Sequence, residues 1–356
     1  MNRSGEILRS SGFSGRPAIG AVVALLLLLV TGCGSEKGNP PAAEPATSPP
    51  PSEKPAGRVI THRSEAEGVA VDAETGLTAV SFRDPNRIEL IDTATGRTVR
   101  RIPTPDPARH LALAAPGGPV LAPIEYSDEL LRIELPSGRT SSVMVGDFPH
   151  DAAEAANGRI FVSDEGGDAI SVVEGDSVEV ELPSPEQPGG VAVSGNTVAV
   201  VAVAAREIAF LDADSLEQVG VVDGGAGPSH VVAGPDDSAG GLGRFYVADT
   251  GGDAILVYEG GDEPRLLDRT NLPGSPYGIA VDSRRNRLWV TQTALNRVVE
   301  LELTDLAPKI IASFPTVRQP NSVGVDERTG AVVVVGRDTG EVQIFDPEDA
   351  AHGAQR

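Results

Sequence analysis

Three of the chain's five histidines recur at similar points of a repeated sequence pattern. His110 precedes the apolar residues 111–113, His150 precedes residues 151–152, and His230 precedes the two valines at 231–232. Each histidine marks the expected start of an innermost strand, where side chains from separate repeats meet. Neutral imidazoles bind zinc or copper, and three of them leave a coordination position open for water or substrate. The pattern therefore predicts a metal or ligand site formed by these three side chains.

Other side chains next to these positions are expected to line the same opening. Small residues, such as Gly68 and Ser322, fill the equivalent position in repeats that lack a histidine. The alternative is structural: each imidazole hydrogen-bonds to a neighbouring strand and binds no ligand, since buried polar groups need partners. The candidate ligand-binding residues beside the histidines are Glu67, Arg109, Tyr277 and Asn321.

The histidines lie in a chain built from seven copies of one pattern. Each copy has an apolar first strand, a turn, a second strand, an Asp or Asn turn and two further strands. A period near 40 residues with about four short strands is typical of a β-propeller blade. The sequence therefore predicts an all-β, seven-bladed β-propeller of four-stranded blades over residues 57–346. The first strands are anchored, at intervals of 40 to 48 residues, by Val69, Leu111, Asp151, Val191, Val231, Ile279 and Val323.

Closure of the ring is also predicted. The seventh repeat ends at Asp346 after only three strands, and residues 347–356 read as a loose tail. Residues 57–62 resemble an outer strand and precede the first blade. We expect residues 59–61 to pair with residues 342–345, which closes the ring and covers a sheet edge.

One repeat carries a family resemblance. Residues 278–282 (Gly-Ile-Ala-Val-Asp), 287–291 (Arg-Leu-Trp-Val-Thr) and 296–298 (Asn-Arg-Val) resemble the repeats of YVTN/NHL-type, YncE-like bacterial propellers. The resemblance covers residues 57–346, although Thr291-Gln292-Thr293 departs from the usual Thr-Asn motif. It implies a propeller that binds a protein or cell-wall ligand, or one that acts as a lactonase or lyase. Some NHL-type lyases use a tri-histidine metal in the channel.

The N-terminus resembles the export signal of a bacterial lipoprotein. Three arginines precede an apolar stretch at residues 18–30, and Val30-Thr31-Gly32-Cys33 resembles a lipobox. This predicts a signal peptide at residues 1–32 and a lipid on Cys33. Residues 33–56, rich in proline, are predicted to form a disordered tether that spans on the order of 70 Å at roughly 3 Å per residue. The protein is then exported and held at the outer face of the cytoplasmic membrane.

Composition restricts the partners. The formal net charge is −22, which repels nucleic acid and anionic headgroups, so that only the lipid is expected to contact the membrane. A single cysteine excludes an intrachain disulfide. We expect a monomer with a cell-wall or protein ligand.

The chain shows no phosphate loop, dinucleotide fingerprint or nucleophile elbow. The sequence therefore favours a binding or scaffold module for an extracytoplasmic ligand or protein partner. The alternative is a metal-dependent, lactonase- or lyase-like enzyme with a histidine-lined site at the channel mouth.

Overall fold

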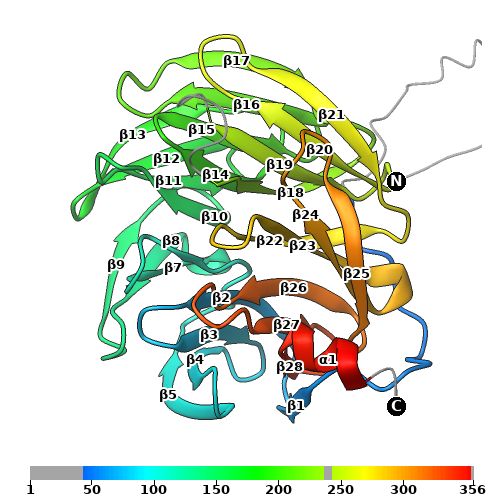
Figure 1. Cartoon of the computed structure of the whole chain (residues 1–356). Coiled ribbons are helices and arrows are strands. Elements are labelled where there is room, and N and C mark those ends of the chain that lie inside the picture. The colour runs from blue at the N-terminus through cyan, green and yellow to red at the C-terminus, as the bar shows by residue number, and fades with distance from the viewer. Residues whose placement is uncertain (1–42, 236–242, 354–356) are drawn as a thin grey trace, which may run out of the picture. The chain divides into compact units, whose positions relative to one another are not determined.

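The structure is a computed structural model that describes residues 43–235 and 243–353 (Figure 1). These residues form seven antiparallel sheets of four strands each, arranged as the blades of a ring. The predicted seven-bladed propeller is therefore confirmed. Cys33 and the predicted signal peptide lie outside the described residues.

The first four blades follow one another in the sequence. Blade one has β2 (Ala66–Asp72), β3 (Leu77–Phe82), β4 (Arg87–Asp92) and β5 (Arg97–Pro103). Blade two has β6 (Ala112–Leu113), β7 (Val120–Ile124), the short 3-10 helix η1 (Glu125–Ser127), β8 (Glu129–Ile133) and β9 (Thr140–Met144). Blade three has β10 (Pro149–Glu154), β11 (Ile160–Asp164), β12 (Ala169–Glu174) and β13 (Ser177–Pro183). Blade four has β14 (Pro188–Ser194), β15 (Thr197–Ala202), β16 (Glu207–Asp212) and β17 (Gln218–Asp223).

The last three blades include the closure. Blade five has β18 (Pro228–Ala233), β19 (Arg244–Asp249), β20 (Ala254–Glu259) and β21 (Arg265–Asn271). Blade six has β22 (Pro276–Asp282), β23 (Arg287–Gln292), the 3-10 helix η2 (Thr293–Leu295), β24 (Arg297–Glu302) and β25 (Lys309–Pro315). Blade seven has β26 (Pro320–Val325), β27 (Val332–Gly336), β28 (Glu341–Phe345) and the N-terminal β1 (Arg58–Thr61).

The position of a strand within its blade determines which of its residues are buried. Second strands such as β3 and β15 are buried along their whole length, and most of their side chains are apolar. Outer strands such as β13 alternate between exposed and partly buried residues. Neighbouring blades pack through their apolar faces, as Phe210 of blade four does against Phe245 and Tyr258 of blade five. Burial between blades provides the main stabilisation of the ring.

The predicted closure is present. β1 pairs antiparallel with β28, with Val59 opposite Gln343 and Ile60 opposite Val342. The first and last parts of the ring are thus joined in one sheet, which leaves β28 with a partner on each side.

The C-terminal segment differs from the predicted loose tail. Residues Pro347–Gly353 form helix α1. Asp346 caps it by accepting the Glu348 N–H at 2.9 Å, and Pro347 suits the first helical turn. Ala350 packs against a cluster that contains Trp289. No helix in the described part of the chain is long and apolar enough to cross a membrane.

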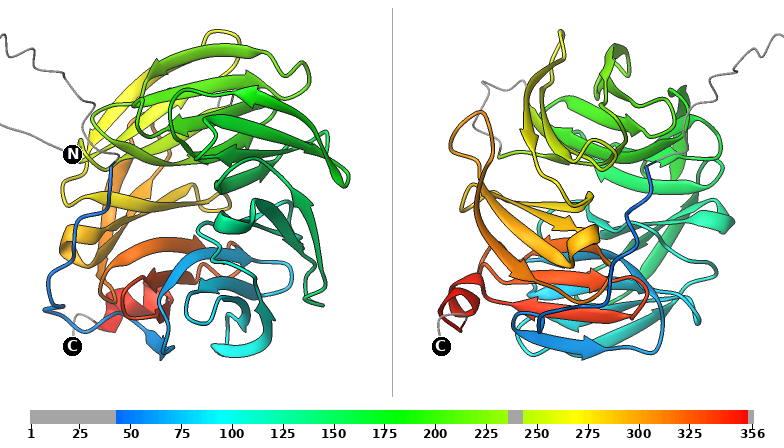
Figure 2. Two further views of the ribbon diagram at one scale, coloured as in Figure 1. Left: turned by 180° about the vertical axis from the view of Figure 1, so that it is seen from behind. Right: turned by 90° about the vertical axis from the view of Figure 1, so that its right-hand side faces the viewer.

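The tether differs as well. Residues 43–56 are extended, as their proline content predicts, but they lie against the ring instead of free in solvent (Figure 2). Ser48 is buried among ring residues, and Ala56 donates to the Pro315 carbonyl at 3.0 Å. We call residues 43–56 the strap. Composition suggested a free chain because the contacts that hold the strap involve mainly its main chain.

Candidate functional site

A register irregularity at the start of the innermost strands positions the candidate residues. In β10 it falls between Pro149 and Asp151, and in β18 between Pro228 and His230. Such bulges redirect side chains away from the regular ladder. The same irregularity occurs in β2, β14, β22 and β26, so that each of these blades turns its first residues toward the channel mouth.

The candidate site residues lie in two layers at the start of the innermost strands. Glu67, Arg109, His150, Tyr277 and Asn321 occupy one equivalent position, which forms the mouth layer. The next position inward forms the axial layer. This differs by one residue from the sequence-based alignment, because His150 belongs to the mouth layer and Asp151 holds the place equivalent to His230. The axial layer contains His110, Asp151, His230 and Ser322.

The structure brings the three predicted histidines together. The ring centroids of His110 and His150 lie 4.5 Å apart, and those of His110 and His230 lie 4.7 Å apart. Tyr277 joins them, with its ring centroid 4.4 Å from that of His230. Four rings from blades two, three, five and six therefore form one contiguous group between the mouth and the axial layer.

Burial governs the protonation of these groups. Loss of hydration, and then the neighbouring His150 and Arg109, lower the pKa of His110 well below its usual value. Burial, with Arg109 and His230 adding to it, has the same effect on the pKa of His150. Burial also lowers the pKa of His230 and raises that of Tyr277 to about 12. At neutral pH the group is uncharged, and each imidazole has one N–H that donates a hydrogen bond and one nitrogen that accepts a hydrogen bond or binds a metal.

His230 is the least satisfied member of the group. Both of its ring nitrogens are buried and have no hydrogen-bond partner in the part of the chain that the structure describes. A buried donor or acceptor left unpaired costs on the order of 1–3 kcal/mol. His230 lines two chambers. One, the mouth chamber, is also lined by His150 and Tyr277, and the other, the axial chamber, is also lined by His110. A water molecule or a ligand in either chamber would satisfy it.

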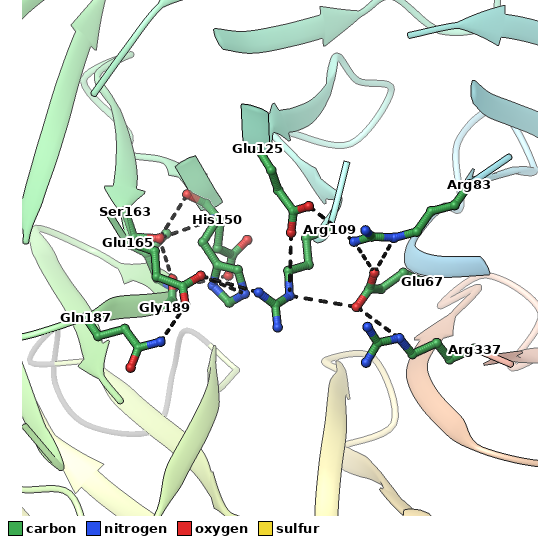
Figure 3. Close-up of polar contacts among 12 residues, drawn as sticks. Glu67, Arg83, Arg109, Glu125, His150, Ser163, Glu165, Gln187, Gly189 and Arg337 are labelled. Carbon is green, nitrogen blue, oxygen red and sulfur yellow. Dashed lines mark hydrogen bonds and ion pairs between the residues drawn. The ribbon is translucent and has the colours of Figure 1, made fainter. Parts of the chain in front are cut away.

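A network of ion pairs extends along the mouth from blade seven to blade three (Figure 3). Arg83 donates to Glu67 at 2.6 Å and lies 3.2 Å from Glu125. Arg109 Nη1 lies 3.5 Å from Glu165, and its Nε lies 3.7 Å from Glu125. The six members come from four blades: Glu67, Arg83, Arg109, Glu125, Glu165 and Arg337. Three cations thus balance three anions in a chain that is strongly acidic as a whole.

The network has electrostatic consequences. Burial opposes the charge of Arg109, but Glu67, Tyr277 and Glu165 outweigh that effect and raise its pKa. Burial raises the pKa of Glu125, although Arg83 and Arg109 oppose the rise. Glu165 also accepts the Gln187 amide at 2.6 Å and lies 3.9 Å from His150 Nε2. A polar ligand at the mouth would find oriented donors and acceptors already held in place.

A second repeat position contributes several mouth residues that were not among the candidates predicted from the sequence. In every blade the residue directly after the second strand faces the mouth region. In blade five that residue, Thr250, donates to the Pro276 carbonyl at 2.7 Å. Reading the repeats at this position would have found Arg83, Glu125, Glu165, Val203, Thr250, Thr293 and Arg337.

Asp151 is the other residue that was missed as a candidate. It lines an axial chamber of about 200 Å³ together with His110, His230 and Ser322. Its carboxylate accepts the Val191 N–H at 3.1 Å and the Ala152 N–H at 2.9 Å, and burial nevertheless raises its pKa to about 7. The axial layer thus contains a carboxyl group whose protonation state changes near neutral pH.

The fit of a metal ion to these residues is partial. His110, His150 and His230 supply neutral donors of the right kind for zinc or copper. Within the described residues, however, no three His, Cys, Asp or Glu side chains are arranged to hold one ion. The imidazoles pack against one another in tilted and edge-on contacts. We therefore derive no chemical step through a metal.

Comparison with known proteins gives a fold and no family. No family model matches the chain, and no curated protein matches it in sequence. Among solved structures, one described as Kuenenia stuttgartiensis hydrazine synthase has a TM-score of 0.68 at 16% identity and covers 81% of this chain and 97% of its own. A virginiamycin B lyase from Staphylococcus aureus has a TM-score of 0.65 at 17% identity, covering 80% of this chain and 97% of its own. The RRP9 WD40 repeats have a TM-score of 0.67 at 13% identity, covering 83% and 99%. At these identities the likeness shows the propeller fold alone.

Proposed function

We propose that this protein is a YVTN/NHL-like, YncE-like propeller lipoprotein, anchored outside the cytoplasmic membrane, that binds a polar extracytoplasmic ligand at its histidine-lined mouth. The observation that supports it most is His230, whose two buried ring nitrogens have no partner among the described residues. Buried histidines are normally hydrogen-bonded to protein groups or to ordered water. A polar ligand that enters either chamber would supply the hydrogen-bond partner that the described residues do not.

The kind of ligand follows from the lining. The mouth offers guanidinium and amide donors, carboxylate acceptors and the faces of aromatic rings, held by Arg109, Glu165, Gln187, Tyr277 and His150. A ligand with both amide and hydroxyl or carboxylate groups suits such a mixture. Cell-wall muropeptides have this chemistry and are found in the compartment to which a lipid on Cys33 would anchor the protein.

Thermal shift with defined muropeptides tests the proposal. We expect the wild type to gain melting temperature with at least one muropeptide. His230→Asn should lose that gain while it keeps its own melting temperature within a few degrees. Wild-type protein that gains nothing from any fragment would contradict the proposed function.

A second candidate is the metal-dependent, lyase- or lactonase-like enzyme, favoured by the contact between the imidazoles of His110, His150 and His230. Elemental analysis of the purified protein, before and after treatment with a chelator, tests it. Zinc or copper in stoichiometric amount, together with muropeptides recovered in altered form, would favour the enzyme. Intact fragments and no metal would favour the binding module.

A further inference from the structure

The strap crosses the mouth face of the ring. In the right-hand view of Figure 2 it runs as a dark blue extended chain over the ends of the innermost strands before it enters β1. At its start, Ala43 and Glu44 line the mouth chamber together with His150, His230 and Tyr277. The segment expected to be a free spacer therefore covers the candidate site.

Ring side chains recognise the main chain of the strap. The Ala46 N–H donates to Ser275 Oγ at 3.1 Å. The Gln319 side-chain amide donates to the Ala46 carbonyl at 3.0 Å and accepts the Ser48 N–H at 2.8 Å. Asn296 donates to the Pro49 carbonyl at 2.8 Å. Contacts of this kind select an extended peptide and depend little on its side chains.

Ser48 is the one side chain that the ring encloses. It is 3% exposed, and its hydroxyl donates to the Thr293 carbonyl and accepts the Gln319 N–H at 3.1 Å. A larger side chain would not fit between these groups. No other residue of the strap, residues 43–56, is buried. A single small anchor and a few hydrogen bonds are typical of a segment that opens locally while the fold stays intact.

The covered chamber is too small for a ligand. With the strap in place its volume is about 30 Å³, which gives room for about two water molecules. Ligand pockets generally enclose roughly 300 Å³ or more. A ligand that reaches His150 at the mouth must therefore displace residues 43 and 44.

We propose that a groove for an extended peptide is formed by Ser275, Thr293, Asn296 and Gln319. Residues 43–49 of the same chain fill this groove and act as a displaceable cover of the mouth chamber. The proposal rests on the proposed function in that the covered chamber is the binding site. It adds the chemistry of the segment that the groove binds: an extended peptide with a small hydroxyl residue followed by proline, which the strap supplies as Ser48-Pro49.

Carbethoxylation of histidines by diethyl pyrocarbonate, located by mass spectrometry on the whole mature chain, tests the cover. Ser48→Leu should open the strap and raise the labelling rate of His150 about tenfold or more, since labelling follows the open population. Gln319→Asn should act in the same direction by removing the amide that holds residues 46 and 48. His62 and His352 serve as internal references and should keep their rates.

The matched control is Glu53→Gln. Glu53 pairs with Arg297 at 2.6 Å, but it is exposed and does not line the chamber. This variant should leave His150 protected. A synthetic peptide of residues 43–51, added to the Ser48→Leu protein, should restore protection, and the same peptide with leucine at position 48 should not.

Unchanged labelling of His150 in both opening variants would overturn the proposal. So would a rise at all five histidines, which indicates loosening of the whole ring, or failure of the wild-type peptide to protect. None of these measurements needs a muropeptide. The strap can therefore be supported even if the thermal-shift test of the proposed function fails, and the reverse also holds.

Discussion

At the scale of single residues, two kinds of buried titratable group change the stability of the fold with pH in opposite directions. Burial lowers the pKa values of His110, His150 and His230, so their neutral forms stabilise the fold above about pH 6.5, and that stabilisation is lost as the pH falls. Burial raises the pKa values of Asp151 and Asp164 to about 7. These carboxyls stabilise the fold most below about pH 4, and their contribution is lost as the pH rises from there through about 7.

A substitution of Asp164 tests the direction of this pH dependence of stability. It is fully buried, and its Oδ2 accepts the Ser171 hydroxyl at 2.7 Å. Its native pKa lies above the unfolded value, so the neutral isostere Asp164→Asn should be more stable than wild type at pH 8, by on the order of 2 kcal/mol. The difference should fade below about pH 4. Urea denaturation at several pH values measures it.

Asp92→Asn is the control for that experiment. Hydrogen bonds from Thr95 lower the pKa of Asp92, so removal of its charge should destabilise the protein near neutral pH. Equal effects of the two substitutions at pH 8 would contradict the assignment of Asp164.

At the scale of elements, the ring depends on β1. The strand joins β28, and Ile60 packs against the cluster that contains Val335 and Val342. Its removal exposes a hydrogen-bonding edge and apolar surface at once. The strap precedes β1 in the chain but makes its own contacts, so the contributions of strap and strand are separable.

Two truncations separate them. A chain that begins at Gly57 keeps β1 and should melt within a few degrees of the mature protein. A chain that begins at Arg63 lacks β1, and its melting temperature should fall by roughly 5–10 °C. It should also self-associate through the open edge of β28. Calorimetry and size-exclusion chromatography give the two readouts, and equal melting of both truncations would show that the closure is dispensable.

At the scale of the whole molecule, the docked strap shortens the link to the proposed anchor. Only residues 34–42 lie between Cys33 and the first strap residue, Ala43. Fully extended, that stretch reaches about 35 Å, which is half the span expected for a free tether from 33 to 56. If Cys33 carries a lipid, we expect the mouth chamber to lie near the membrane while the strap is docked.

Lipidation itself has a direct test. Cells that express the wild type should incorporate an alkyne analogue of palmitate into the protein, and cells that express Cys33→Ala should not. The variant should also leave the membrane fraction. Equal labelling of the two proteins would remove the anchor from the proposal and leave the groove and the chamber unaffected.

The sequence by itself determined the architecture. Seven repeats of alternating apolar strands and Asp, Asn or Gly turns admit few folds other than a closed ring of sheets, and the incomplete seventh repeat identified β1 as the closing strand. The convergence of His110, His150 and His230 was also predictable, because the starts of the innermost strands of separate blades meet at the axis. Local patterns decide these features, since each blade repeats the same pairing.

Tertiary structure alone decided the layers of the site and its cover. The register of β10 places His150 in the mouth layer and Asp151 in the axial layer, as that of β18 places Ser229 and His230. Composition suggested a free tether, yet Gln319 and Ser275 hold its main chain. Both outcomes depend on contacts between residues far apart in sequence. Main-chain recognition leaves little trace in residue type, which is why the pattern of the sequence did not reveal the docked strap.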